Sequence, residues 1–195
     1  MIVTSGTGLA NTVPGQPAQE DNPVVSSGAH PHAASEEAAA ASAIEGVNVS
    51  VVRLPQVHDP LKQGLITPVI SIYREKGGVC AYVGDGLTRW PAAHVLDAAR
   101  LYRLAVEKAE PNAKYHAVAE EGVTMRDIAE AIGRRLNLPV KSITSEEAPA
   151  YFGWLARFAG DDVPASSEQT RRKLGWQPTG PRLIADLERL QISDS

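Results

Sequence analysis

Cysteine is almost absent from this sequence: Cys80 is the single one among 195 residues, so an intrachain disulfide is excluded. Such cysteine usage fits a reducing compartment. No apolar run approaches the roughly 18–20 residues of a membrane span. The first residues lack the basic and long apolar segments of a signal peptide, and no lysine or arginine precedes Arg53. We therefore expect a cytoplasmic protein that makes no membrane contact.

Several motifs with a defined chemistry are missing as well. There is no Gly-x-Ser-x-Gly elbow of a serine hydrolase, no phosphate-binding loop ending in Gly-Lys-Ser/Thr, and no dinucleotide-binding glycine fingerprint. Only His30 and His32 lie close together among the histidines, without a third ligand at helical spacing, so we assign no metal site. The 19 basic and 23 acidic side chains give a net charge of −4, which does not favour a nucleic-acid partner.

What the sequence does contain is an alternation of strand and helix patterns. Such alternation favours an α/β protein with a parallel sheet and right-handed crossovers. Residues 8–31 are rich in Gly, Pro and Asn and predict a loop long enough to be functional or mobile. Strands are expected at 2–3, 47–52, 79–83, 114–119 and 140–143, and helices at 33–44, 65–76, 97–107, 125–136, 145–158, 166–174 and 180–190.

Some single residues carry local predictions. Gly46 ends the helix at 33–44, where a C-terminal glycine is favoured. Thr124 is expected to cap the helix at 125–136, with Asp127 at the capping-box position, and Asp97 to cap the helix at 97–107. Three aromatic residues are predicted to pack in the core of the C-terminal part: Trp154, Phe158 and Trp176.

Four stretches taken together resemble a known family. Residues 1–7 (Met-Ile-Val-Thr-Ser-Gly-Thr) are similar to a strand that carries an active-site Ser or Thr, and residues 46–58 to the next strand with its Arg-Pro-x-x-Val continuation. Residues 84–99, from a Gly-Asp-Gly turn to Val-Leu-Asp-Ala-Ala, and residues 174–178 (Leu-Gly-Trp-Gln-Pro) follow in the family's order. The chain thus resembles the C-terminal two-thirds of an extended or atypical short-chain dehydrogenase/reductase, in the NAD-dependent epimerase/dehydratase family.

The resemblance implies a fold that is the second half of a Rossmann-like parallel sheet, from the family's fifth strand onward, with a small mixed C-terminal substrate subdomain. We expect a partial nucleotide-binding domain at 1–119 and a mostly helical subdomain at 120–195, or an interleaving of the two through residues 60–95. The family's first four strands and its glycine fingerprint have no counterpart here. The first strand is therefore expected to present an unpaired edge, which favours marginal stability or a homo- or hetero-oligomer.

The resemblance also implies a set of site residues. The family's Tyr-x-x-x-Lys pair is replaced by His32 and Glu36, which lie one helical turn apart on one face. His32 can exchange a proton near neutral pH, but a carboxylate raises its partner's pKa where the lysine lowers it. The remaining residues implied are Ser5 and Thr7 for catalysis, Thr4, Pro55 and Val57 for the cofactor, and Arg89 and Trp90 for the substrate.

Each assignment has a structural alternative. Ser5 and Thr7 could simply end a surface strand, His32 and Glu36 could begin a solvated helix, and residues 55–57 could be a rigid strand exit. The function implied is an NAD- or NADP-dependent oxidoreductase or epimerase acting on a small carbonyl or alcohol substrate, truncated and catalytically impaired. The alternatives are a non-catalytic binding or regulatory subunit that pairs with a full-length relative, and a fragment of a longer chain.

Overall fold

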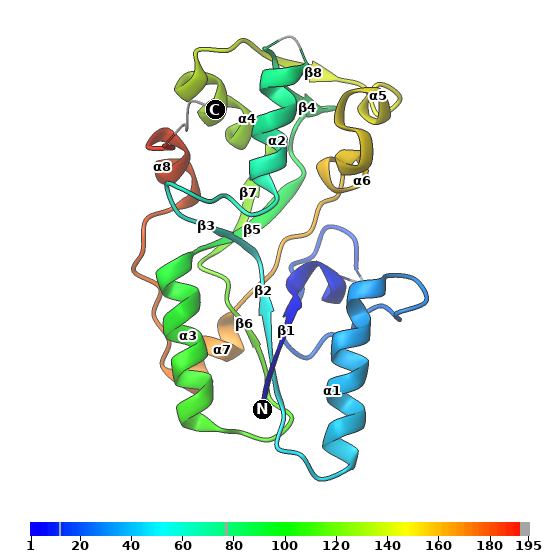
Figure 1. Cartoon of the computed structure of the whole chain (residues 1–195), viewed down its shortest axis with the longest axis vertical. Helices are drawn as coiled ribbons and strands as arrows, with labels where there is room; N and C mark the ends of the chain where they lie inside the picture. The colour runs from blue at the N-terminus through cyan, green and yellow to red at the C-terminus, as the bar shows by residue number, and fades with distance from the viewer. Residues whose placement is uncertain (12, 77, 192–195) are drawn as a thin grey trace.

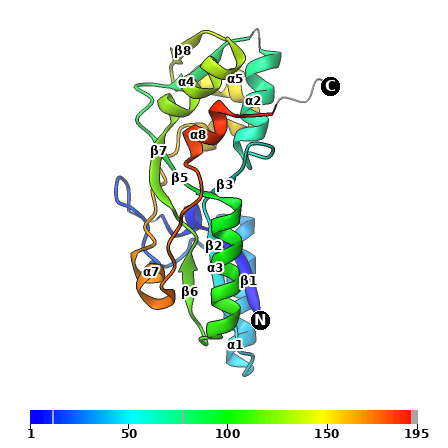
Figure 2. The same cartoon turned by 90° about the vertical axis from the view of Figure 1, so that its left-hand side faces the viewer.

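The computed structural model describes residues 1–11, 13–76 and 78–191, and they form two lobes that share a central cavity (Figure 1). The lower lobe is built on a three-stranded parallel sheet in the order β1 (Ile2–Gly6), β2 (Ser50–Leu54) and β6 (Lys114–His116). The helices α1 (Ala34–Ile44) and α3 (Val95–Lys108) flank this sheet, and α7 (Glu168–Leu174) lies against β6 and α3 (Figures 1 and 2). The predicted α/β class with a parallel sheet is confirmed.

The central strand β2 is buried over most of its length because it has a neighbour on each edge and helices on its faces. A near-continuous β-branched run is typical of such a strand. The strand begins three residues later than expected, at Ser50, and extends to Leu54. Its register with β1 pairs Ser5 with Arg53 and Gly6 with Leu54, so the predicted catalytic strand ends beside Pro55.

The upper lobe contains a mixed sheet, a two-stranded parallel sheet and most of the short helices. The mixed sheet has the order β3 (Gln56–His58), β5 (Arg89–His94) and β7 (Glu120–Thr124), in which β5 and β7 are antiparallel. The second sheet pairs β4 (Cys80–Val83) with β8 (Val140–Ile143). Around them lie α2 (Ile66–Glu75), α4 (Met125–Leu136), α5 (Ala148–Phe152), α6 (Ala156–Ala159) and α8 (Leu183–Glu188). Three 3-10 turns, η1 (Thr7–Ala10), η2 (Pro31–Ala33) and η3 (Gly153–Leu155), complete the description.

The sequence did not predict β3, β5 or β7. Each is short, and their residues lack a β-branched or alternating pattern: β5 contains Pro91, and β7 begins with Glu120, Glu121 and Gly122. Tertiary pairing, rather than local propensity, makes these strands. The predicted helices over 145–158 and 180–190 are also shorter in the structure, and the first is broken by η3.

Each lobe has its own apolar core. The upper core includes Tyr73, Ile128, Phe152 and Leu183. The lower core includes Leu101, Tyr115 and Trp176, which confirms the prediction for Trp176. The prediction for Trp154 is wrong, since this side chain is 65 % exposed in η3 and stacks edge-on against Phe158.

The helix caps differ from the expectation at one position. Thr124 caps α4 as predicted, its Oγ1 accepting the backbone N–H of Asp127 at 3.1 Å. The cap of α3 is His94, whose Nδ1 accepts the N–H of Leu96 at 3.2 Å, so the prediction that Asp97 caps this helix is wrong. Asp97 instead lies buried in the first turn, because its carboxylate receives N–H groups from a distant part of the chain.

The outer edge of the lower sheet belongs to β1. Within the described residues β1 pairs with β2 alone, and Ile2 and Val3 are only half-buried. The helix α1 packs against β1 and lies next to it in Figure 1. The structure therefore contains the free, partly apolar edge that the sequence predicts, while the predicted oligomer stays a prediction.

Candidate functional site

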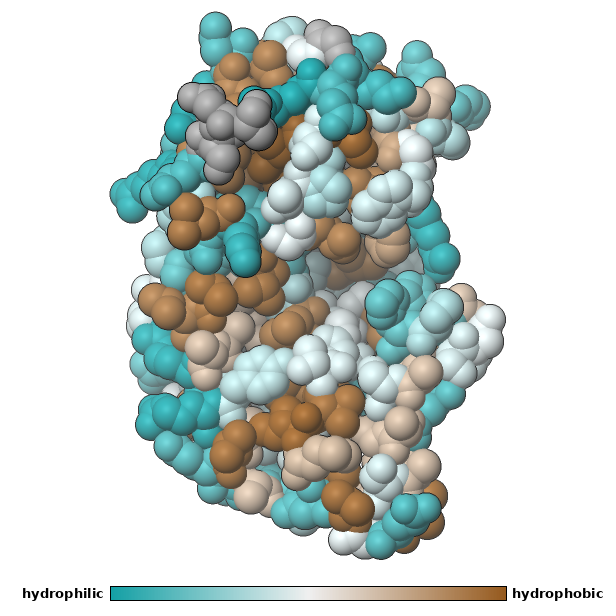
Figure 3. Space-filling view, in the orientation of Figure 1, coloured by the Kyte–Doolittle hydropathy of each residue, from teal (hydrophilic) through white to brown (hydrophobic). Residues whose placement is uncertain are grey.

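A large cavity lies between the two lobes, at the carboxyl end of β1. Its volume is about 1090 Å³, which is at the upper end of the range for small-molecule sites. Figure 3 shows the hollow between the lobes, with hydrophobic residues along its upper side. The lower wall comes from β1, η1 and η2, and the upper wall from the segment after β2, the start of β5 and residues 157–163. In parallel α/β sheets this end of the strands is where ligands bind.

The structure brings most of the predicted site residues to this cavity. Two are absent from its lining: Glu36, which is buried elsewhere, and Arg89, which lies behind the wall. The predicted residues that line the cavity are Thr4, Ser5, Thr7, His32, Pro55, Val57 and Trp90. These residues are up to 86 positions apart in the sequence, so their gathering comes from the fold.

The lower wall carries polar groups that are free to bind a ligand. The Ser5 hydroxyl and His30 Nδ1 are buried, and neither has a hydrogen-bond partner among the described residues. By contrast, Thr4 Oγ1 is 2.6 Å from the Tyr102 hydroxyl, and Thr7 donates weakly to the Leu54 carbonyl at 3.4 Å. A buried polar atom without a partner costs free energy unless a ligand or a water satisfies it. Ser5 and His30 are therefore the best-placed hydrogen-bonding groups of this wall.

Glu36 points away from the cavity and forms a buried ion pair. Arg53 Nε donates to Glu36 Oε1 at 2.8 Å, and Arg53 Nη2 donates to Oε2 at 2.9 Å, so the pair is bidentate. Burial alone would raise the pKa of Glu36, but the contacts of its carboxylate with Arg53 and with the Ser5 side chain hold this pKa below its ordinary value. Both oxygens of Glu36 are thus engaged by Arg53, and the proton-exchange role of His32 stays a prediction.

Arg53 is the centre of a buried polar network in the lower lobe. Its side chain is 0 % exposed. Arg53 Nη1 also donates to the carbonyl of Glu20 at 3.2 Å and to His116 Nε2 at 3.2 Å. The other ring nitrogen of His116 donates to the carbonyl of Ser166 at 2.8 Å, which leaves a neutral ring. One guanidinium therefore joins α1, β2, β6 and the loop between η1 and η2.

The free energy of unfolding is expected to decrease as the pH is lowered, because His116 is buried in its neutral form. Burial is the main cause that lowers the pKa of His116 from 6.5 to about 4. The unfolded chain takes up this proton below pH 6.5 and the folded chain does not, so stability is full above pH 6.5 and is lost as the pH falls toward 4. The full loss is roughly 3 kcal/mol. Burial also lowers the pKa of His58, which acts in the same direction.

The measurement is the melting temperature as a function of pH between 7 and 4. His116→Gln is expected to flatten this dependence, whatever its effect on stability at pH 7. The exposed His32 is the matched control, and His32→Gln should leave the dependence unchanged. An unchanged slope in His116→Gln would contradict the assignment.

The upper wall is made of aromatic residues and an ion pair behind them. The indole N–H of Trp90 donates to the Phe158 carbonyl at 3.1 Å, so the ring presents carbon to the cavity. Arg89 donates to both oxygens of Asp162, from Nε at 3.0 Å and from Nη2 at 2.7 Å. The hydrogen bond between them raises the pKa of Arg89 and lowers that of Asp162. The substrate contact predicted for Arg89 would therefore have to compete with Asp162.

Sequence reasoning missed several residues of this cavity. The sequence marks His30 only as a possible metal ligand, and it gives no role to Arg157, Asp161 or Asp162. Adjacent carboxylates at 161–162 before a proline are a weak sign of a functional loop, and no periodic pattern marks them. Their place in the wall depends on the antiparallel pairing of β5 with β7 and on the backbone bond from Val163 to the Arg89 carbonyl, at 2.9 Å.

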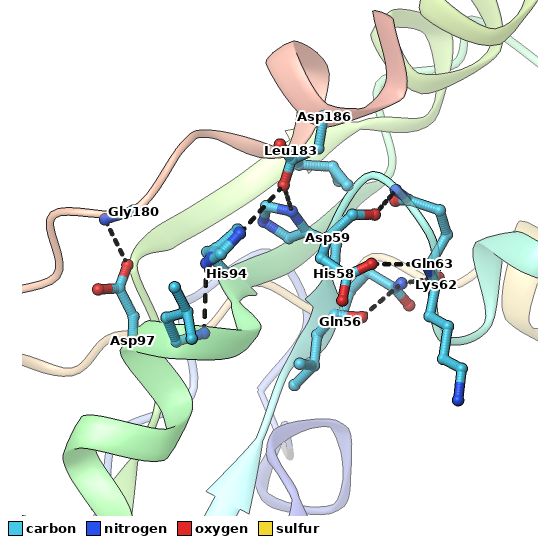
Figure 4. A network of polar contacts seen from close by, with 12 residues as sticks. Gln56, His58, Asp59, Lys62, Gln63, His94, Asp97, Gly180, Leu183 and Asp186 are labelled. Atoms are coloured by element: carbon cyan, nitrogen blue, oxygen red, sulfur yellow. Dashed lines mark hydrogen bonds and ion pairs between the residues drawn. The ribbon is translucent and has the colours of Figure 1, made fainter. Parts of the chain in front are cut away.

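A second polar cluster joins β3, the start of α3 and α8, as Figure 4 shows. His58 Nδ1 donates to Asp186 Oδ2 at 2.7 Å, and His94 Nε2 lies 3.8 Å from the same oxygen. All three side chains are buried. None of these three residues lines the cavity. The cluster therefore attaches α8 to β3 and to the end of β5, and it is not part of the site.

Neither a metal-binding group of side chains nor a membrane-spanning helix is present among the described residues. No group of three or more His, Cys, Asp or Glu side chains in this part of the chain is arranged to hold a metal ion. No helix within residues 1–11, 13–76 and 78–191 is long and apolar enough to cross a membrane.

Solved structures share this fold over nearly the whole chain. The chain superposes on dTDP-glucose 4,6-dehydratase from Streptomyces venezuelae, solved with NAD, with a TM-score of 0.72, 19 % identity, and coverage of 97 % of this chain and 57 % of the other. For the NAD complex of UDP-glucose 4-epimerase from Thermus thermophilus, the TM-score is 0.70, with 20 % identity and coverage of 97 % and 61 %. The chain therefore has the Rossmann-like fold of the nicotinamide-dependent dehydratases and epimerases.

Among proteins of known sequence, the chain is similar to two uncharacterized yeast proteins. One, from Schizosaccharomyces pombe, is 46 % identical over 146 residues, which are 74 % of this chain and 49 % of that protein. The other, from Saccharomyces cerevisiae, is 40 % identical over 156 residues, which are 80 % of this chain and 52 % of that protein. The chain thus spans about half the length of these relatives. No protein-family model matches it.

Proposed function

We propose that the chain is the substrate-side part of an NAD- or NADP-dependent oxidoreductase or epimerase of the epimerase/dehydratase family, acting on a carbonyl or alcohol substrate. The observation that carries this proposal is the cavity at the end of β1. Its wall gathers most of the residues that the family resemblance assigns to chemistry and to the cofactor, within a fold whose neighbours are solved with NAD or NADPH.

The residues present fit the nicotinamide end of such a cofactor. Pro55 and Val57 provide a flat, mostly apolar surface beside the end of β1, and the Ser5 hydroxyl lacks a partner there. When bound, the cofactor would accept or deliver a hydride. Ser5 would then hydrogen-bond the substrate oxygen, while Trp90 and Phe158 exclude water from it.

Proton transfer is the step in which this chain departs from its family. We propose that His32, which faces the cavity, takes the place of the family's tyrosine as the group that exchanges a proton. The lysine position is filled by Glu36, and this carboxylate is bound to Arg53. Because no lysine stands one helical turn after His32 to lower its pKa, we expect catalysis to be impaired.

The second candidate is a non-catalytic subunit that pairs with a longer relative. The free edge of β1 favours it, because a strand with unpaired N–H and C=O groups is a template for another strand. This candidate predicts no cofactor binding by the chain alone. It is contradicted if the melting transition of the purified chain moves upward with a nicotinamide cofactor.

A thermal melt with and without millimolar NAD(H) or NADP(H) tests the proposed function. A ligand at 100 times its dissociation constant stabilises the folded state by about 2.7 kcal/mol, which is several degrees for a chain of this size. We expect a cooperative transition that moves upward with a nicotinamide cofactor and not with ATP. A cooperative transition that does not move would favour the binding subunit.

A matched pair of variants locates the binding. Val57→Lys places a long side chain in the wall of the cavity and should abolish the shift. Val106→Lys makes the same change at an exposed position of α3 and should retain it. An equal shift in both variants would place the cofactor elsewhere.

A further inference from the structure

The cavity wall has an unusual balance of charge for a fold whose neighbours act on nucleotide sugars. dTDP-glucose and UDP-glucose each carry a diphosphate, and proteins normally bind such groups with arginine, lysine or a helix N-terminus. Among the described lining residues, the side chains that are charged at neutral pH are Arg157, Asp161 and Asp162. The acidic groups therefore outnumber the basic one.

The charge of each arginine near the cavity, Arg89 and Arg157, is offset by an aspartate close to it. Arg89 is held by both oxygens of Asp162 and donates to the carbonyl of Gly15 at 3.2 Å. Arg157 acts electrostatically on Asp161: burial raises the pKa of Asp161, and the Arg157 charge opposes that rise. Each arginine is thus matched with an aspartate.

The helix N-terminus at the cavity does not compensate for this shortage. The turn η2 and the start of α1 reach the cavity through Pro31, His32 and Ser35. The first turn of α1, however, contains Glu36 and Glu37. Two carboxylates in a first turn offset the positive end of the helix dipole, so this end attracts anions weakly.

The remaining surface suits a neutral, largely apolar molecule. Trp90 presents carbon, because its N–H is bonded to a backbone carbonyl, and Phe158, Leu65 and Val163 extend the apolar wall. At the opposite wall, Ser5 and His30 carry buried polar atoms without partners among the described residues. Such groups can hydrogen-bond the single carbonyl or hydroxyl oxygen of a neutral ligand.

We propose that the cavity takes an uncharged, mainly apolar carbonyl or alcohol compound and rejects nucleotide sugars and other phosphorylated substrates. This inference rests on the proposed function, since it names the substrate class of the same site. Asp161 and Asp162 set the specificity by offsetting the charges of the two arginines, so the wall keeps no net positive charge for a phosphate.

The test compares two ligands that differ by one phosphate: 4-hydroxyacetophenone and 4-acetylphenyl phosphate. Saturation-transfer NMR titrations of the full chain at low salt give both dissociation constants, with UDP-glucose as a competitor. We expect saturable binding of the neutral ketone, at least tenfold weaker binding of its phosphate, and no displacement by UDP-glucose. Equal or tighter binding of the phosphate, displacement by UDP-glucose, or absence of ketone binding would each overturn the proposal.

A charge reversal tests the mechanism of rejection. Asp161→Lys replaces a carboxylate of the wall by an ammonium group, leaves an excess of positive charge there and should tighten binding of the phosphate at least tenfold. Glu75→Lys makes a comparable change at the far end of α2 and should change the dissociation constant of the phosphate less than twofold.

The thermal melt with nicotinamide cofactors distinguishes this proposal from the proposed function. A cofactor shift without ketone binding overturns the substrate class alone, and ketone binding without a cofactor shift overturns the proposed function alone.

Discussion

Replacing Arg53 with alanine is expected to destabilise the protein by about 3–5 kcal/mol and to lower its melting temperature by roughly 10 °C or more. The variant leaves Glu36 as a buried carboxylate without its cation, and it removes the donor to His116 Nε2. It also leaves the Glu20 and Asn22 carbonyls without this partner. Thermal and urea unfolding of the purified variant measure the loss.

The matched control is Arg103→Ala. Arg103 donates to Glu107 at 3.1 Å, but both side chains are more than half exposed, so the pair contributes at most about 1 kcal/mol. Arg53→Lys is expected to lie between the two, because a lysine supplies the charge without the bidentate geometry. Melting temperatures of Arg53→Ala and Arg103→Ala within a degree of each other would show that the network contributes nothing.

Replacing Asp97 with alanine is expected to cost about 3 kcal/mol. The Asp97 carboxylate accepts the N–H of Thr179 at 3.0 Å and that of Gly180 at 2.9 Å, and it pairs with Arg100. Hydrogen bonds to charged groups contribute more to the free energy of unfolding than bonds between neutral groups. The variant also leaves two backbone N–H groups without an acceptor. The backbone approaches so closely at Gly180 that a Cβ there would lie 2.8 Å from Asp97 Oδ2.

Two further variants make the Asp97 prediction specific. Asp97→Asn retains one acceptor oxygen and is expected to cost about half as much. The exposed Asp21 is the control, since Asp21→Ala should change the free energy of unfolding by less than about 0.5 kcal/mol. Hydrogen exchange should show faster exchange around residues 176–191 in Asp97→Ala. If that segment exchanges as in the parent chain, Asp97 does not hold it.

The parts of the fold with local signals were predictable from the sequence. The alanine-rich run gave α1, the β-branched residues gave β2 with a small shift, and Thr124 marked the start of α4. The strands β3, β5 and β7 depend on pairing between distant segments, and nothing within their few residues indicates it. Asp97 followed the same rule: its neighbours predict a cap, while its partners lie 82 and 83 residues away.

The site was predictable to the extent that it follows the family's strand order. Ser5, Thr7, Pro55 and Val57 lie together because β1 and β2 are adjacent and parallel. Helical spacing predicts that Glu36 lies near His32. The spacing does not reveal that Arg53, on the neighbouring strand β2, binds the Glu36 carboxylate. An arginine within a β-branched strand was the available sign, because a buried cation requires a buried anion.

The crossing of the chain between the lobes has a consequence for how the cavity meets its ligand. The polypeptide passes from the lower to the upper lobe between β2 and β3 and returns between β5 and α3. It passes to the upper lobe again between β6 and β7, and it crosses once more on each side of α7. Several backbone connections therefore fix the spacing of the walls, so widening the cavity requires all of them to bend together. A ligand that fits would lose its own freedom on binding but would not have to order the protein, which is the thermodynamic advantage of a preorganised receptor.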